Sequence, residues 1–195
     1  TLGWVITAIL SPLILIVVII IALLSGTTQH NNAAVDLVFN GGAFPPSMDA
    51  DYANHIRVMQ GCLVTLDNGI ASVNAEMEDG FLDSAMVKSV FYSLCFGDGS
   101  LSLSSSEAEA FAACFVRYET RTREVASEPD PDTGEVTTTT EEYTVAVPAS
   151  IWEAHNNLAA QGYPVTSELS DNARAVYVRI AYGNSGSYSG TIEYG

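Results

Sequence analysis

The chain has 195 residues, with 7 basic against 23 acidic side chains and a formal net charge of −16. Such a surface would repel nucleic acid, because phosphate binding needs a high density of Lys and Arg, and it would also be repelled by anionic lipid headgroups. We therefore expect no nucleic-acid partner, and we interpret the acidity as an aid to solubility.

The first 26 residues predict a transmembrane anchor. Trp4 to Leu24 is a run of 21 residues without a charge, and at about 1.5 Å per residue it spans roughly 31 Å, the thickness of a bilayer's hydrocarbon core. Pro12 is tolerated in membrane helices, and Trp4 lies where an interfacial aromatic residue belongs. One alternative, a signal peptide, has a shorter apolar region of about 7–15 residues. The other, a soluble core helix, is rarely apolar on every face.

The orientation of this anchor follows from the positions of Lys and Arg. The first basic residue after the span is Arg57, and basic residues near a span favour the cytoplasmic side. We therefore expect a single-pass protein of the cell membrane, with its C-terminal part outside the cell. Residues 27–47 predict an extracellular stalk, in which Pro45 and Pro46 exclude helix.

Helical patterns follow over the first part of residues 48–183, the predicted juxtamembrane domain. Apolar residues three or four apart from Ile56 to Met77 predict a long helix, which Gly61 and Gly69 weaken by about 1 kcal/mol each, so a break is possible. A shorter helix is expected between a cap at Asp83 and a stop at Gly97. A third helix is expected to begin with a capping box between Ser106 and Glu109.

A long two-stranded β-hairpin is predicted at about 114–148. Thr, Val and Tyr are frequent in "CFVRYETRTREV" and in "VTTTTEEYTVAVP", and a segment dense in Pro, Asp and Gly separates these two stretches. The charged residues indicate a solvated outer half, and the base must pack on the helices because an isolated hairpin is marginal in water. For the base we expect Phe115, Tyr118, Tyr143, Val145 and Val147. We also expect Arg117, Arg121 and Arg123 to face Glu119, Glu141 and Glu142 on the hairpin, in a register that the sequence does not define.

Two closing helices are predicted after Pro148. The first ends at Gly162, and the second runs from a cap at Ser170 or Asp171 to Gly183. The Gly/Ser-rich residues 184–195 predict a linker to a further domain. Because the chain also starts at Thr1, we expect it to be a piece of a longer protein. The predicted fold class is α+β: one transmembrane helix, then a small helical domain with a long antiparallel hairpin.

Few residues suggest catalytic or metal chemistry. Glu128, Asp130 and Asp132 alternate as calcium ligands do, but the glycine at 134 comes one place late, so a plain turn is the favoured interpretation. Carboxylates cluster near the end of the long helix, as glycosidases require, although a helix end and a cap explain them equally. This cluster contains Glu76, Glu78, Asp79 and Asp83.

The cysteines and histidines do not indicate a thiol enzyme. Cys62, Cys95 and Cys114 show no zinc-ligand spacing, and we interpret them as buried free thiols; one disulfide with one thiol left over is the alternative. His55 is too far along its helix from Cys62 for a direct hydrogen bond, and His155 is expected to be exposed. The tyrosines near the end are interpreted as packing residues rather than a sugar-stacking surface. No catalytic residue, cofactor or metal is therefore predicted.

The order of these segments resembles membrane-anchored cell-wall (peptidoglycan) hydrolases of Gram-positive conjugative and mobile elements. The anchor stretch "TLGWVITAILSPLILIVVIIIALLSGTTQHNNAAVDLVFNGG", the strand "VRYETRTREV" and its return "TTTTEEYTVAVP" carry the resemblance. It implies a non-catalytic N-terminal region that anchors and positions a wall-cleaving domain during DNA transfer. The catalytic residues of such proteins lie in domains that nothing in this sequence matches.

Two other interpretations stay open. In one, the chain is a structural subunit of a conjugation channel that docks partners through its hairpin. In the other, it is itself an enzyme. The partners expected are the lipid bilayer and either peptidoglycan or proteins of the conjugation machinery.

Overall fold

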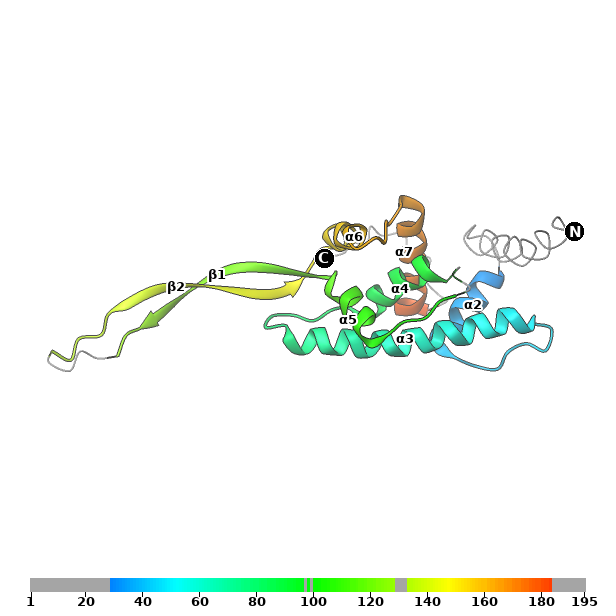
Figure 1. The fold of residues 1–195 in the computed structure, drawn as a ribbon, viewed down its shortest axis with the longest axis horizontal. Helices are drawn as coiled ribbons and strands as arrows, with labels where there is room; N and C mark the ends of the chain where they lie inside the picture. Colours follow the sequence, from blue (N-terminus) through cyan, green and yellow to red (C-terminus); the bar gives the residue numbers. More distant parts are fainter. Residues whose placement is uncertain (1–28, 97, 99, 129–132, 184–195) are drawn as a thin grey trace, which may run out of the picture.

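The computed structural model describes residues 29–183 except 97, 99 and 129–132. Its fold is α+β, as predicted, with a group of helices and one antiparallel hairpin (Figure 1). The elements in chain order are α2 (Gln29–Asn40), α3 (Ala50–Glu76), α4 (Ser84–Cys95), α5 (Ser105–Ala113), β1 (Val116–Ala126), β2 (Thr138–Pro148), α6 (Ile151–Ala160) and α7 (Ser167–Tyr182).

The predicted anchor, with Trp4, Pro12 and Leu24, lies outside the described residues, as does the predicted linker at 184–195. Within the residues that the structure describes, none of the helices combines the length and the apolar character that crossing a bilayer requires.

The long helix α3 forms the platform of the fold. It is continuous through Gly61 and Gly69, so the break that these glycines made possible does not occur. Asp49 caps it by accepting hydrogen bonds from the backbone N–H groups of Asp51 and Tyr52. Helices α2, α4 and α5 pack against α3, and α7 packs against α4. The largest fully buried apolar side chains include Ile56, Met59 and Leu66 of α3, Val87 of α4 and Leu158 of α6.

Helix α2 occupies much of the predicted stalk. Its Ala34, Val35 and Val38 are buried in the core, and the Gln60 side chain of α3 donates a hydrogen bond to the Leu37 carbonyl. These residues recur at helical spacing, so one face of α2 packs against the core instead of serving as a solvated spacer. Pro45 and Pro46 do lie outside helices, as expected.

The remaining helices begin at polar caps. Asp83 caps α4, as predicted. The capping box of α5 joins Ser104 and Glu107 rather than Ser106 and Glu109, because the first of the three serines in the run takes the cap position. Helix α7 starts earlier than predicted, at Ser167, because Thr166 accepts a hydrogen bond from the Leu169 N–H.

Candidate interaction ribbon

The β1–β2 hairpin is a ribbon that projects from the helices, on the side of the molecule away from α2 (Figure 1). Its base is part of the core: Phe115, Val116, Val145 and Val147 are buried. The predicted base residues Tyr143 and Tyr118 behave differently, because Tyr143 is half-buried and Tyr118 is 76% exposed. Tyr118 lies on the ribbon face opposite to that of Val145 and Val147.

The register of the ribbon defines two faces and two edges. Val116 is opposite Pro148, and pairing continues without a bulge to Ala126 opposite Thr138. The Ala149 N–H donates to the Phe115 carbonyl at one end, and the Ser127 N–H donates to the Thr137 carbonyl at the other. Hydrogen-bonded and non-hydrogen-bonded pairs alternate between these ends. Odd-numbered residues therefore bond across the ribbon, and even-numbered residues turn their backbone groups outward.

One face of the ribbon, formed by the odd-numbered residues, carries a chain of ion pairs. Arg117 contacts Glu119 and lies 3.8 Å from Glu153 of α6. Arg121 bridges Glu119 and Asp79, with 2.8 Å to the Asp79 carboxylate. These contacts connect β1 to α6 and to the loop between α3 and α4, so they hold the ribbon at a defined position on the helices.

Farther out on the same face, Arg123 forms the one predicted ion pair that crosses between the strands. Its guanidinium donates twice to the Glu141 carboxylate, at 2.9 and 3.0 Å, and lies over the Tyr143 ring. Glu142 is opposite Thr122 on the other face, and it has no ion pair within the described part of the chain. The arginines therefore face Glu119 and Glu141, as expected, whereas Glu142 does not take part in these contacts.

The arginines shift the titration of the carboxylate between them. Hydrogen bonds from Arg121 and then from Arg117 lower the pKa of Glu119. Reciprocally, hydrogen bonds to Asp79 and Glu119 raise the pKa of Arg121. The Glu119 carboxylate and the Arg121 guanidinium therefore both stay charged at neutral pH.

The other face, formed by the even-numbered residues, is rich in threonine and open to solvent. Thr120, Thr122, Thr140 and Thr144 are all exposed on it. Its charged residues are Glu124 and Glu142, so this threonine face carries negative charge and no cation. Neither face of the outer ribbon completes the hydrophobic core, which leaves both available for contact with other molecules.

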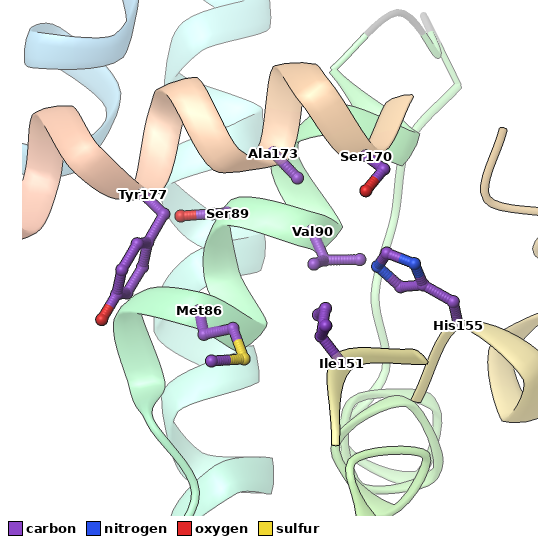
Figure 2. A pocket seen from close by; sticks show the side chains of 8 residues that line it. All are labelled: Met86, Ser89, Val90, Ile151, His155, Ser170, Ala173 and Tyr177. Atoms are coloured by element: carbon purple, nitrogen blue, oxygen red, sulfur yellow. The ribbon is translucent and has the colours of Figure 1, made fainter. Parts of the chain in front are cut away.

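A small cavity lies away from the ribbon, between α4, α6 and α7 (Figure 2). His155 of α6 points into it toward Val90, with Ser170 of α7 above. The prediction of an exposed His155 is wrong: its ring is half-buried, its Nε2 has no hydrogen-bond partner in the described residues, and burial lowers its pKa. The lining combines apolar side chains with the hydroxyl groups of Ser89, Ser170 and Tyr177, and in the described residues none of these hydroxyls is hydrogen-bonded to the Nε2 of His155.

The cysteines are free thiols, as predicted. Cys62 and Cys114 are buried, and Cys95 is half-buried. Burial raises the pKa of all three, and for Cys95 burial together with the nearby Asp98 raises it to about 12. Thiols with raised pKa values are poor nucleophiles. His55 contacts the Phe96 carbonyl instead of a cysteine, so the structure does not assemble a Cys–His pair there.

The carboxylate cluster near the end of α3 has structural contacts. Asp79 pairs with Arg121, and Asp83 caps α4 while accepting a hydrogen bond from the Tyr177 hydroxyl at 2.9 Å. In the acidic turn that was compared with a calcium loop, Asp130 and Asp132 lie outside the described residues. Among the residues described, no group of three or more His, Cys, Asp or Glu side chains could hold a metal ion.

Sequence reasoning missed two features of the ribbon. The first is Asp79, which reaches Arg121 from another part of the fold and had no local signal. The second is the threonine face: the alternation of Thr with charged residues in β1 indicates it, but only the register shows that threonines of β2 contribute to the same face.

The fold and the ribbon define a class by architecture alone: an α+β helical module with a projecting two-stranded ribbon. No protein-family model matches the sequence, and no curated protein and no solved structure is significantly similar to it.

Proposed function

We propose that this chain is a non-catalytic positioning module that contacts a partner through the β1–β2 ribbon. The observation that carries the proposal is the solvent exposure of the ribbon's outer part on both faces. Ordering each backbone residue costs about 1–2 kcal/mol. Burial of apolar side chains offsets this cost at the base of the ribbon but not in its outer part. A partner that covers the ribbon would supply the missing contacts.

The setting we propose for the module is the one that the resemblance implies. Residues 1–26 would anchor it in the cell membrane, and it would position a peptidoglycan hydrolase during conjugative DNA transfer in a Gram-positive bacterium. Two points support this. The ribbon projects on the side of the molecule away from α2, the helix that follows the predicted anchor in the sequence (Figure 1), so a tether that enters the module at α2 would leave the ribbon accessible. Tethering would also confine a lytic activity and raise its effective concentration at one place.

Deleting residues 120–144 and joining Glu119 to Val145 through an Asn-Gly turn tests this proposal, because the deletion removes the outer ribbon and leaves the buried base intact. The matched control replaces residues 128–135 with a Gly/Ser segment of equal length, which keeps both strands. We expect the deletion variant to fold and to reach the membrane but to mislocalise wall lysis, whereas the control behaves as the parent chain. Normal lysis sites in a folded deletion variant would contradict the positioning role.

A second candidate function is a subunit of a conjugation channel, which the open edges of the ribbon favour. It predicts that channel proteins copurify with the parent chain and are lost from the deletion variant, while the pattern of wall lysis stays normal. A zymogram distinguishes both candidate functions from the interpretation in which the chain is itself an enzyme. Clear lysis of peptidoglycan by the 195-residue chain alone would overturn the non-catalytic assignment.

A further inference from the structure

The outer edge of β2 is an unpaired strand. Because odd-numbered residues bond to β1, the N–H and C=O groups of Thr138, Thr140, Glu142 and Thr144 point away from the ribbon. In the described part of the chain, β1 is the one strand paired with β2. Unpaired edges of this kind accept an additional strand from another polypeptide.

The two edges of the ribbon differ in charge. Strand β2 contains Glu141 and Glu142 and no basic residue, whereas β1 contains three arginines and two glutamates. The β1 arginines are already paired with carboxylates of the ribbon, of α6 or of the α3–α4 loop. A cationic segment is therefore attracted more strongly to the β2 edge than to the β1 edge.

We propose that the β2 edge binds an extended segment of a partner protein that carries Lys or Arg, and that this segment adds as a third, antiparallel strand. The proposal rests on the proposed function, and it specifies the chemistry of the ribbon's partner. Residues opposite each other in an antiparallel pair lie on the same face. The partner residue opposite Glu142 therefore carries the cation, and β-branched residues lie opposite Thr140 and Thr144.

The same geometry disfavours a second copy of this chain as the added strand. Pairing two β2 edges would add further acidic residues and offer no cation to Glu142 in any register, and it would be destabilising in the register that places the two Glu142 side chains opposite each other. The free edge of β1 offers no cation to Glu142, because its outward residues are Tyr118, Thr120, Thr122, Glu124 and Ala126. A different protein is thus required to neutralise Glu142.

The test uses the 195-residue chain in detergent micelles and a blocked ten-residue peptide of alternating Thr and Lys. Thr144→Pro removes one outward N–H from the β2 edge, and Thr120→Pro removes one from the β1 edge directly opposite. Pro is tolerated where an edge N–H faces solvent. We expect the peptide to bind the parent chain and Thr120→Pro equally, and to bind Thr144→Pro about tenfold more weakly because one strand–strand hydrogen bond is lost.

Two further variants and two further peptides separate the contribution of charge to binding from that of backbone hydrogen bonds. Glu142→Gln should weaken binding and Glu124→Gln should not. A Thr/Glu peptide should not bind, and a Thr/Lys peptide with alternate amides N-methylated should lose affinity although its charge is unchanged. Amide shifts confined to residues 138–146 should accompany binding by the parent chain.

Several outcomes would overturn the assignment of the β2 edge. They are equal binding of the Thr/Lys and Thr/Glu peptides, equal loss in Thr120→Pro and Thr144→Pro, full binding of the N-methylated peptide, or a ribbon edge occupied by a second copy at the protein concentrations used. If any of these occurs while the 120–144 deletion still mislocalises lysis, the positioning function stands and only the proposed partner chemistry fails.

Discussion

Arg179 of α7 and Asp36 of α2, which are 143 positions apart in the sequence, form an ion pair that joins these two helices. The Arg179 Nε donates to Asp36 Oδ1 at 2.8 Å, and a second guanidinium nitrogen contacts Oδ2. The Arg179 side chain is only 18% exposed, against 40% for Asp36. The pair therefore fixes α2, the helix that follows the predicted anchor, to the last helix of the fold.

Asp36→Ala should destabilise the fold by about 1–3 kcal/mol, because it leaves a largely buried guanidinium without its acceptor. The control is Glu141→Ala, which breaks the Arg123–Glu141 pair, whose side chains are 57% and 52% exposed. We expect the control to cost about 0–1 kcal/mol. Urea unfolding of both variants measures the difference. Equal losses would show that the buried pair contributes no more than the exposed one.

A second prediction concerns the crossing of α3 and α5 at Gly69. A Cβ at Gly69 would lie 2.6 Å from the Ala108 carbonyl carbon, whereas a Cβ at Gly61 has no such neighbour within 4 Å. Gly69→Ala should therefore cost about 1–3 kcal/mol through displacement of the α5 backbone. Gly61→Ala, in the same helix, should stabilise the fold by about 0.5–1 kcal/mol. Thermal unfolding compares the two, and a stabilising effect at Gly69 would contradict the close crossing.

The helices and strands could be predicted from the sequence wherever their signals are local. Asp83 caps α4, and both ribbon strands occupy the Thr- and Val-rich stretches that flank the Asp/Pro turn. Helix α2 was missed because its residues are mostly polar or small. The spacing of Ala34, Val35 and Val38 carried the signal, but the proximity of Pro45 and Pro46 favoured a stalk.

The ribbon's contacts were predictable only in part, because residue types do not determine register. The composition indicated arginines facing glutamates, and the register selects Arg123 with Glu141 while placing Glu142 on the other face. The pairing of Arg121 with Asp79 depends on how the α3–α4 loop packs against the ribbon. A contact of that kind is decided by tertiary packing and has no sequence signature.

A third prediction concerns pH and His155. Burial lowers the pKa of His155 in the folded chain from its ordinary 6.5, so the unfolded chain binds a proton at a higher pH than the folded chain does. The stabilisation from the neutral imidazole is therefore complete above the unfolded value of about 6.5 and is lost as pH falls toward the folded value. Of the side chains that line the cavity with His155, the one other titratable group is Tyr177, which donates to Asp83.

Urea midpoints measured between about pH 7.5 and 5 check this, because the unfolded carboxylates titrate mostly below that range. The parent chain should lose stability as the pH falls, and His155→Gln should show a flatter profile because it lacks the titrating ring. Parallel profiles for the two proteins would show that His155 is not the group whose protonation opposes folding.

The last prediction concerns the reactivity of the three thiols. Because burial raises the pKa of Cys62, Cys95 and Cys114, little thiolate is present at about pH 8, and thiolate is the species that reacts with alkylating reagents. All three thiols of the folded chain should therefore react slowly with iodoacetamide. In denaturant all three should react quickly, and mass spectrometry counts the adducts. Rapid alkylation of Cys62 or Cys114 in the folded chain would contradict their burial, and a denatured, unreduced chain with only one reactive thiol would reveal a disulfide between the other two.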